Sequence, residues 1–134
     1  MIKKTLVVGA GVSGGAAYDF LLKRNIAVDL LEDSRKGSVN LADYDKIVLS
    51  SGVPPDISLV VDAKKMGLCV IAEADLGLLS FPNPKIGITG SNGKTTTVML
   101  VAFVLNYYGQ KAACVGNIGN AICAYDGPRG DYGY

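Results

Sequence analysis

The sequence predicts an α/β protein built on a parallel sheet. Short apolar runs that suit buried strands alternate with stretches that suit helices, and this alternation requires parallel strands joined by right-handed crossovers. Glycine-rich turns at residues 9–15 and 90–93 each join an expected strand to an expected helix. These features predict a Rossmann-like domain over residues 1–83, with a linker at residues 81–84, and a second βα unit over residues 84–134.

Local signals place the elements of the first domain. A β-branched, apolar run at residues 5–8 ends at a glycine and predicts a strand, and the residues after the turn predict a helix over 12–24. Prolines exclude a helix just before the one expected over residues 58–66, and Gly67 suits the left-handed position that closes it. The remaining expected elements are strands at residues 27–31, 46–49 and 68–71 and a short helix at residues 73–79.

The second unit repeats the order of strand, turn and helix. An apolar run at residues 86–88 predicts a buried strand, and a helix is expected over residues 96–108, ending near Gly109. Beyond it we expect a strand at residues 111–115, a turn-rich stretch at 116–120, a loop at 126–130 and the start of another strand at 131–134.

The composition predicts a globular chain and excludes several classes of function. Of the 134 residues, 49% are apolar and 19% are charged, and the net charge is +1, so no basic field exists to hold nucleic acid. We recognise no signal peptide and no bilayer-length apolar run, so we expect no membrane association. The three cysteines are expected to be reduced core residues of a cytoplasmic protein. Histidine is absent, which excludes a histidine base, and no obligate protein partner is evident.

The first glycine-rich turn has the spacing of a dinucleotide-binding fingerprint. Gly9, Gly11 and Gly14 follow an expected strand, and Glu32 and Asp33 stand about twenty positions further on. The acidic residues follow the carboxyl end of a strand, where open α/β sheets bind their ligands. The pattern favours a nucleotide ligand but leaves its identity open, and the alternative is that the glycines only allow close packing of a helix on a strand.

The second glycine-rich turn predicts a phosphate-binding loop. The stretch from Gly90 to Gly93 lets backbone N–H groups converge at the positive end of a helix dipole. Lys94 adds a charge that can reach terminal phosphates, and the Thr95 hydroxyl can help hold Mg²⁺. Ile88 stands where the common pattern has glycine, so the alternative is an ordinary turn with a surface lysine. A lysine at a helix N-terminus is unfavourable unless an anion is bound there, which favours the phosphate loop.

Three motifs together carry a family resemblance: Gly-Ala-Gly-Val-Ser-Gly at residues 9–14, Thr-Gly-Ser-Asn-Gly-Lys-Thr-Thr at 89–96 and Gly-Asn-Ile-Gly at 116–119. From about residue 5 onward, the chain resembles the N-terminal part of a Mur ligase, one of the ATP-dependent amide ligases of peptidoglycan synthesis. The resemblance implies that residues 84–134 are the truncated start of a P-loop ATPase domain and that a C-terminal amino-acid-binding domain is absent. Folylpolyglutamate synthetases share this architecture, but the Rossmann-like domain argues against them.

The resemblance also implies a reaction and its site residues. ATP, with Mg²⁺, phosphorylates the carboxylate of UDP-N-acetylmuramoyl-L-alanine to an acyl phosphate, and attack by the amine of D-glutamate gives an amide, ADP and phosphate. Lys94 and Thr95 would be catalytic, with Thr95 also at the metal. The residues implied to bind ATP are Gly90, Ser91, Asn92, Gly93, Lys94, Thr95 and Thr96. Those implied to bind the UDP substrate are Val12, Ser13, Asp33, Ser34, Arg35, Ser51, Gly52 and Asn117, of which Asn117 also suits a turn or helix cap.

The chain as given is expected to bind the UDP portion of the substrate but not to ligate, because the implied second-metal carboxylate and amino-acid site are missing. Two other functions stay open. A nicotinamide- or flavin-dependent oxidoreductase is supported by the first glycine-rich turn alone, and a regulatory nucleotide-binding module is compatible with a truncated chain. Binding of NAD or NADP would favour the oxidoreductase, whereas tight binding of UDP-N-acetylmuramoyl-L-alanine would favour the ligase.

Overall fold

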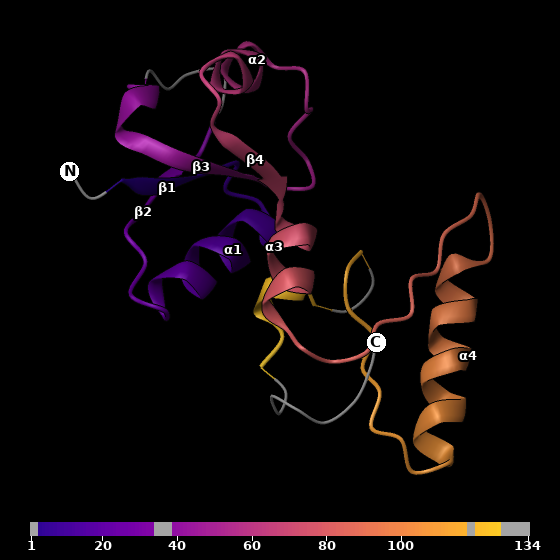
Figure 1. Cartoon of the computed structure of the whole chain (residues 1–134). Coiled ribbons are helices and arrows are strands. Elements are labelled where there is room, and N and C mark those ends of the chain that lie inside the picture. The colour runs from indigo at the N-terminus through magenta and orange to yellow at the C-terminus, as the bar shows by residue number, and fades with distance from the viewer. Residues whose placement is uncertain (1–2, 34–38, 118–119, 127–134) are drawn as a thin grey trace.

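The computed structural model describes residues 3–33, 39–117 and 120–126, and these confirm the predicted α/β class. Four parallel strands form one sheet in the order β2-β1-β3-β4 (Figure 1). The strands are β1 (Lys4–Val8), β2 (Val28–Leu31), β3 (Tyr44–Leu49) and β4 (Cys69–Ala72). Because all four run in the same direction, their carboxyl ends meet at one edge of the sheet.

Helices cover both faces of this sheet (Figure 1). α1 (Val12–Leu22) and α3 (Glu73–Ser80) lie on one face, and α2 (Ser58–Lys65) lies on the other. Successive strand residues point to opposite faces, so Val7 packs towards α1 and α3 whereas Leu6 packs towards α2. Each strand therefore needs apolar residues at consecutive positions, which is why the strands read as continuous apolar runs in the sequence.

The expected elements of the first domain are confirmed, with small shifts at their ends. α1 ends at Leu22, two residues before its expected end, and the chain turns at Asn25, where φ is 56°. Gly67 follows α2 with a φ of +77°, the left-handed conformation expected of it. β3 begins at Tyr44, two residues before its expected start, and the Tyr44 hydroxyl donates to Asp29 Oδ2 at 2.9 Å.

The prediction of strands at residues 86–88 and 111–115 is wrong. Within the described residues neither segment pairs into a sheet, and Val115 makes a single bridge, to Asn120. Ile86 is 51% exposed. A strand is stable when its backbone groups are paired with a neighbouring strand, and within the described residues neither segment has such a neighbour. Residues 131–134, expected to begin a strand, lie outside the described residues, as does most of the loop expected at 126–130.

The expected linker at residues 81–84 is irregular but tightly packed. The Phe81 ring lies edge-on against Phe20 and Tyr125, with centroids 6.0 and 5.7 Å away. Tyr125 follows the 3-10 turn η2 (Ile122–Ala124), which packs against α1 and α3. The chain therefore returns to the first βα layers after it has formed the second unit.

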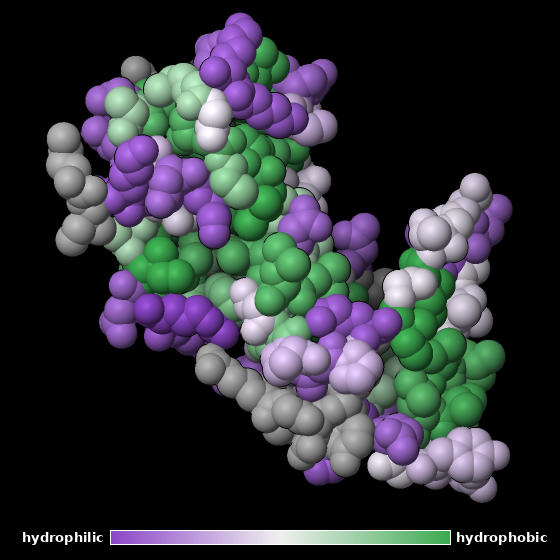
Figure 2. All heavy atoms as spheres, viewed as in Figure 1, coloured by the Kyte–Doolittle hydropathy of each residue, from purple (hydrophilic) through white to green (hydrophobic). Residues whose placement is uncertain are grey.

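α4 (Lys94–Tyr107) stands apart from the sheet (Figure 1). None of its residues, all of which are described, is buried, and its apolar side chains produce the green surface over this helix in Figure 2. Gly109 follows it with a φ of +80°, as the expected end of this helix requires. In the three described ranges, no helix has the length and apolarity needed to cross a bilayer.

The expectation that the cysteines are core residues is only partly correct. Cys123 is buried, Cys114 is half-buried and Cys69 is exposed. Cys69 begins β4 at the edge of the sheet, where one side of the strand has no neighbour among the described strands. A cysteine with apolar neighbours in the sequence can therefore still be exposed when it lies on an edge strand.

Candidate functional site

A cavity of about 330 Å³ opens at the carboxyl edge of the sheet. Open α/β sheets bind their ligands at this edge, because the loops that follow the strands leave a crevice there. The walls come from the start of α1, the loop after β3, the start of α3 and the segment before η2. The lining residues are Val12, Ser13, Ser51, Ala72, Glu73, Ala74, Gly116, Asn117 and Ala121.

The first glycine-rich turn brings α1 unusually close to β1. A Cβ on Gly14 would lie 1.7 Å from the Gly9 carbonyl oxygen, and a Cβ on Gly9, whose φ is +93°, would lie 2.6 Å from Val53 Cγ2. Packing therefore requires glycine at both positions, as expected if the motif allows a helix to lie close to a strand. Close packing does not exclude ligand binding, because no described side chain caps the first turn of α1. Its leading N–H groups face the carboxyl edge and can receive an anion.

Three serines fasten α1 to the loop after β3. Ser13 Oγ lies 2.8 Å from Ser50 Oγ and 3.1 Å from Ser51 Oγ, and the Ser51 backbone N–H donates to Ser13 Oγ at 2.9 Å. Ser50 is buried, whereas Ser51 is exposed on the loop. The cluster holds two walls of the cavity together and leaves hydroxyl groups at its mouth. Sequence reasoning missed Ser50, although its place directly after β3 was a usable signal.

The structure brings part of the predicted UDP-substrate set around this cavity. Val12, Ser13, Ser51 and Asn117 line it, although they come from three separate segments of the chain. Gly52 is exposed beside Ser51, and Asp33 is half-buried just beyond the end of β2. Two members of the predicted set, Ser34 and Arg35, lie outside the described residues.

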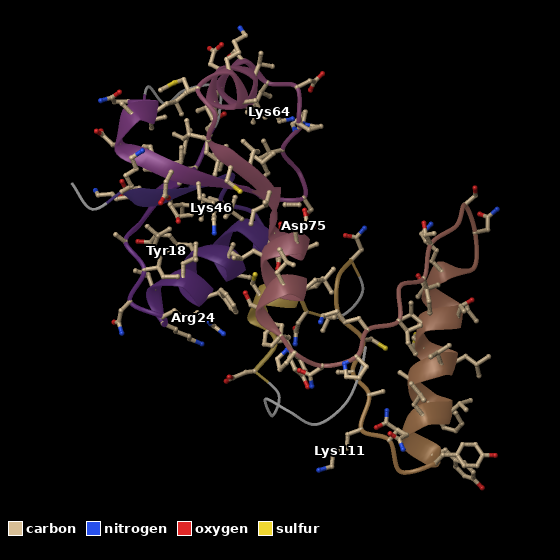
Figure 3. All side chains as sticks on the ribbon, viewed as in Figure 1. Tyr18, Arg24, Lys46, Lys64, Asp75 and Lys111 are labelled. Carbon is tan, nitrogen blue, oxygen red and sulfur yellow. The ribbon has the colours of Figure 1, made fainter. Side chains whose placement is uncertain are left out.

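Sequence reasoning also missed the buried acidic residue in the cavity wall. Glu73, the first residue of α3, is 5% exposed, and its Oε1 accepts a hydrogen bond from the Cys123 backbone N–H at 2.6 Å. Burial and then the Glu73 carboxylate raise the pKa of the Cys123 thiol well above its usual value, so this thiol is kept protonated. Asp75 fixes the start of the same helix, since its Oδ2 accepts from the Ala72 N–H at 3.2 Å (Figure 3). Glu73 could have been found from its position directly after a strand, at the same edge as the predicted residues.

The predicted phosphate loop lies before α4 and is exposed. Gly90 and Gly93 have φ values of +149° and +76°, conformations that residues with a Cβ rarely adopt. Lys94 Nζ donates to the Gly90 carbonyl oxygen, and Thr97 Oγ1 donates to the Gly93 carbonyl oxygen at 2.8 Å. The side chains predicted to join them in holding ATP, which are Ser91, Asn92, Thr95 and Thr96, are all exposed.

The residues present fit a nucleotide phosphate at this loop. No described side chain caps the N-terminus of α4, so its leading N–H groups are available to an anion, and an ammonium group lies within the loop. Over the part of the chain with described positions, no cluster of three His, Cys, Asp or Glu side chains could form a metal site.

The chain is similar to curated ligases over nearly its whole length. A UDP-N-acetylmuramoylalanine–D-glutamate ligase of Protochlamydia amoebophila is 36% identical over 142 aligned positions, which cover 90% of this chain and 32% of that relative. Enzymes with the same name from Streptococcus mutans and Francisella philomiragia are 40% and 36% identical, over 87% and 98% of this chain and 31% and 33% of the relatives. The chain thus spans about a third of the length of the curated relatives it matches.

Family models and solved structures were also compared with the chain. No family model matches the chain. A crystal structure of the UDP-N-acetylmuramate–alanine ligase of Thermotoga maritima matches with a TM-score of 0.42 and 21% identity, over 80% of this chain and 30% of that protein. The assignment that follows rests on the sequence relatives.

Proposed function

We propose that this chain belongs to the Mur ligase family over the third of those proteins that it spans, and that the complete protein adds D-glutamate to UDP-N-acetylmuramoyl-L-alanine in peptidoglycan synthesis. The observation that carries the proposal is the cavity at the carboxyl edge of the sheet, lined by residues from separate segments that the family motifs identify. We assign to this cavity the binding of the UDP substrate. A protein with these substrates would work in the cytoplasm.

The walls of the cavity suit the parts of a sugar nucleotide differently. The uncapped N-terminus of α1 presents N–H groups and the positive end of a helix dipole, so it suits the diphosphate. The hydroxyls of Ser13 and Ser51 lie beside it and can donate to phosphate oxygens. The Asn117 side chain, on the facing wall, can donate and accept hydrogen bonds and suits the sugar or its linkage.

The loop before α4 is proposed to hold ATP with Mg²⁺. When bound, ATP supplies the phosphoryl group that activates the substrate carboxylate. Lys94 would exchange its hydrogen bond with the Gly90 carbonyl for one with a phosphate, neutralising negative charge where it accumulates. Thr95 would place its hydroxyl at the metal.

The 134-residue chain by itself is proposed to bind the UDP portion of the substrate without ligating. The cavity is present in this chain, but the loop that would hold ATP is exposed, and no sheet covers α4 among the residues that the structure describes. An exposed loop lacks the water-excluded surroundings in which charge stabilisation becomes effective for catalysis.

Calorimetry with UDP-N-acetylmuramoyl-L-alanine tests the proposal on this chain. We expect saturable binding that is weakened in Ser13→Ala, because this hydroxyl joins both the serine cluster and the cavity wall. NAD is the control ligand, since a nicotinamide-dependent enzyme would use the same glycine-rich turn. Binding of NAD in place of the UDP substrate would contradict the ligase assignment and favour an oxidoreductase.

A further inference from the structure

The wall of the cavity that carries Asn117 is fastened to α3, and we propose that Glu73 is the residue that positions this wall for the sugar nucleotide. The inference rests on the proposed function and deepens it by adding a residue to the UDP-substrate site. Glu73 would act through the Asn117 segment, by holding that segment in place.

The first step is the link between Glu73 and the segment around Cys123. The two residues are 50 positions apart, and the carboxylate Oε1 accepts from the Cys123 N–H at 2.6 Å in a buried setting. The Cys123 thiol also donates to the Glu73 carbonyl oxygen, at 3.5 Å. A hydrogen bond to a charged acceptor is stronger than a neutral one, and losing it would leave a buried N–H without a partner.

The second step runs from Cys123 back to Asn117. The Gly116 N–H donates to the Asn120 carbonyl oxygen at 2.9 Å, and Val115 and Asn120 form a bridge, so the two ends of the Asn117 segment are held together. Residues 121–123 follow directly and are buried against α1 and α3. The base of the Asn117 segment is therefore placed by the contacts that residues 121–123 make with α1 and α3.

The third step is the fit between α3 and Ile122. A Cβ on Gly77 would lie 2.4 Å from Ile122 Cγ2, so α3 presents bare backbone about one turn beyond Glu73, and this space receives the Ile122 side chain. Apolar packing at Gly77 is not directional, whereas the hydrogen bond from Cys123 to Glu73 is. Apolar packing thus holds η2 against α3, and the hydrogen bond to Glu73 fixes the position of η2 along α3.

The charge of Glu73 argues against direct contact with the diphosphate. The carboxylate lines the same cavity as the start of α1, where we place the phosphates. Like charges at close range repel, so a carboxylate that touched the diphosphate would weaken binding. A role in holding the opposite wall is consistent with both its burial and its partner.

Two substitutions separate this role from an effect of charge. Glu73→Asp keeps the charge but shortens the side chain by one methylene, so it withdraws the acceptor from Cys123. Glu73→Gln removes the charge but keeps an oxygen at the same reach. In calorimetry of the 134-residue chain with UDP-N-acetylmuramoyl-L-alanine, we expect Glu73→Asp to weaken binding about tenfold and Glu73→Gln to stay within about threefold of the original. If Glu73→Gln weakened binding more than Glu73→Asp, the proposal would be overturned.

A double-mutant cycle with Asn117→Ala tests whether Glu73 acts through Asn117. We expect Glu73→Asp to weaken binding by less than about twofold when Asn117 is already alanine, because the wall it positions no longer carries the contacting side chain. Equal effects of Glu73→Asp in both backgrounds would overturn the inference while leaving the proposed function intact. Absence of binding by the original chain would instead overturn the proposed function, and the inference with it. Circular dichroism of each variant confirms that the comparison is between folded proteins.

Discussion

Replacing Gly14 by alanine tests whether close approach of α1 to β1 builds the first turn. The added Cβ would lie 1.7 Å from the Gly9 carbonyl oxygen and 2.9 Å from its carbon, and backbone atoms cannot move aside as a flexible side chain can. Overpacking of this kind destabilises by up to about 3 kcal/mol, against a gain of about 1 kcal/mol when alanine replaces a helical glycine. Gly14→Ala is therefore expected to lower the free energy of unfolding by about 2 kcal/mol.

Gly15→Ala is the matched control. Gly15 is the next residue of the same helix, but a Cβ there would meet nothing within 4 Å. This variant is expected to raise the free energy of unfolding by about 0.5–1 kcal/mol, because alanine loses less backbone entropy than glycine. Urea unfolding followed by far-ultraviolet circular dichroism measures both variants against the original chain. If Gly14→Ala proves as stable as Gly15→Ala, the packing argument for the first turn is refuted.

Three further predictions concern the phosphate loop, the linker and Tyr44 at the start of β3. In the complete protein, Lys94→Ala should lower kcat at least tenfold, because a charge-assisted hydrogen bond contributes about 1.5–3 kcal/mol; a kcat close to the original would remove Lys94 from the mechanism. Phe81→Ala should lower the free energy of unfolding by about 3–5 kcal/mol in urea titrations, whereas Leu79→Ala, at a side chain 81% exposed, should change it by less than about 0.5 kcal/mol. Burial and then the Asp29 carboxylate raise the pKa of Tyr44 from 10.0 to about 12, so the folded state favours the neutral phenol, and this stabilisation is present below pH 10 and lost as the pH rises towards 12. Thermal unfolding of Tyr44→Phe should show a smaller loss of stability over that interval, and an equal loss would contradict the assigned cause.

The candidate site was predictable where its residues follow strands in short, recognisable motifs. Ser13 and Ser51 stand directly after glycine-rich or strand-ending positions, and the structure places both at one cavity. The ligand-binding roles of these residues stay predictions. Ser50 and Glu73 escaped sequence reasoning, since neither belongs to a motif and their importance depends on neighbours from distant segments.

The sequence by itself determined the four parallel strands of the first unit, the helices between them and the turns at Gly67 and Gly109. Apolar runs and glycines act over a few neighbouring residues, so these choices need no knowledge of the rest of the chain. Tertiary structure decided that residues 86–88 stay unpaired, that Phe81 is buried in an irregular segment, and that Cys123 returns to Glu73. Each of these outcomes depends on which distant segment is available as a partner, and local sequence does not show which segment that is.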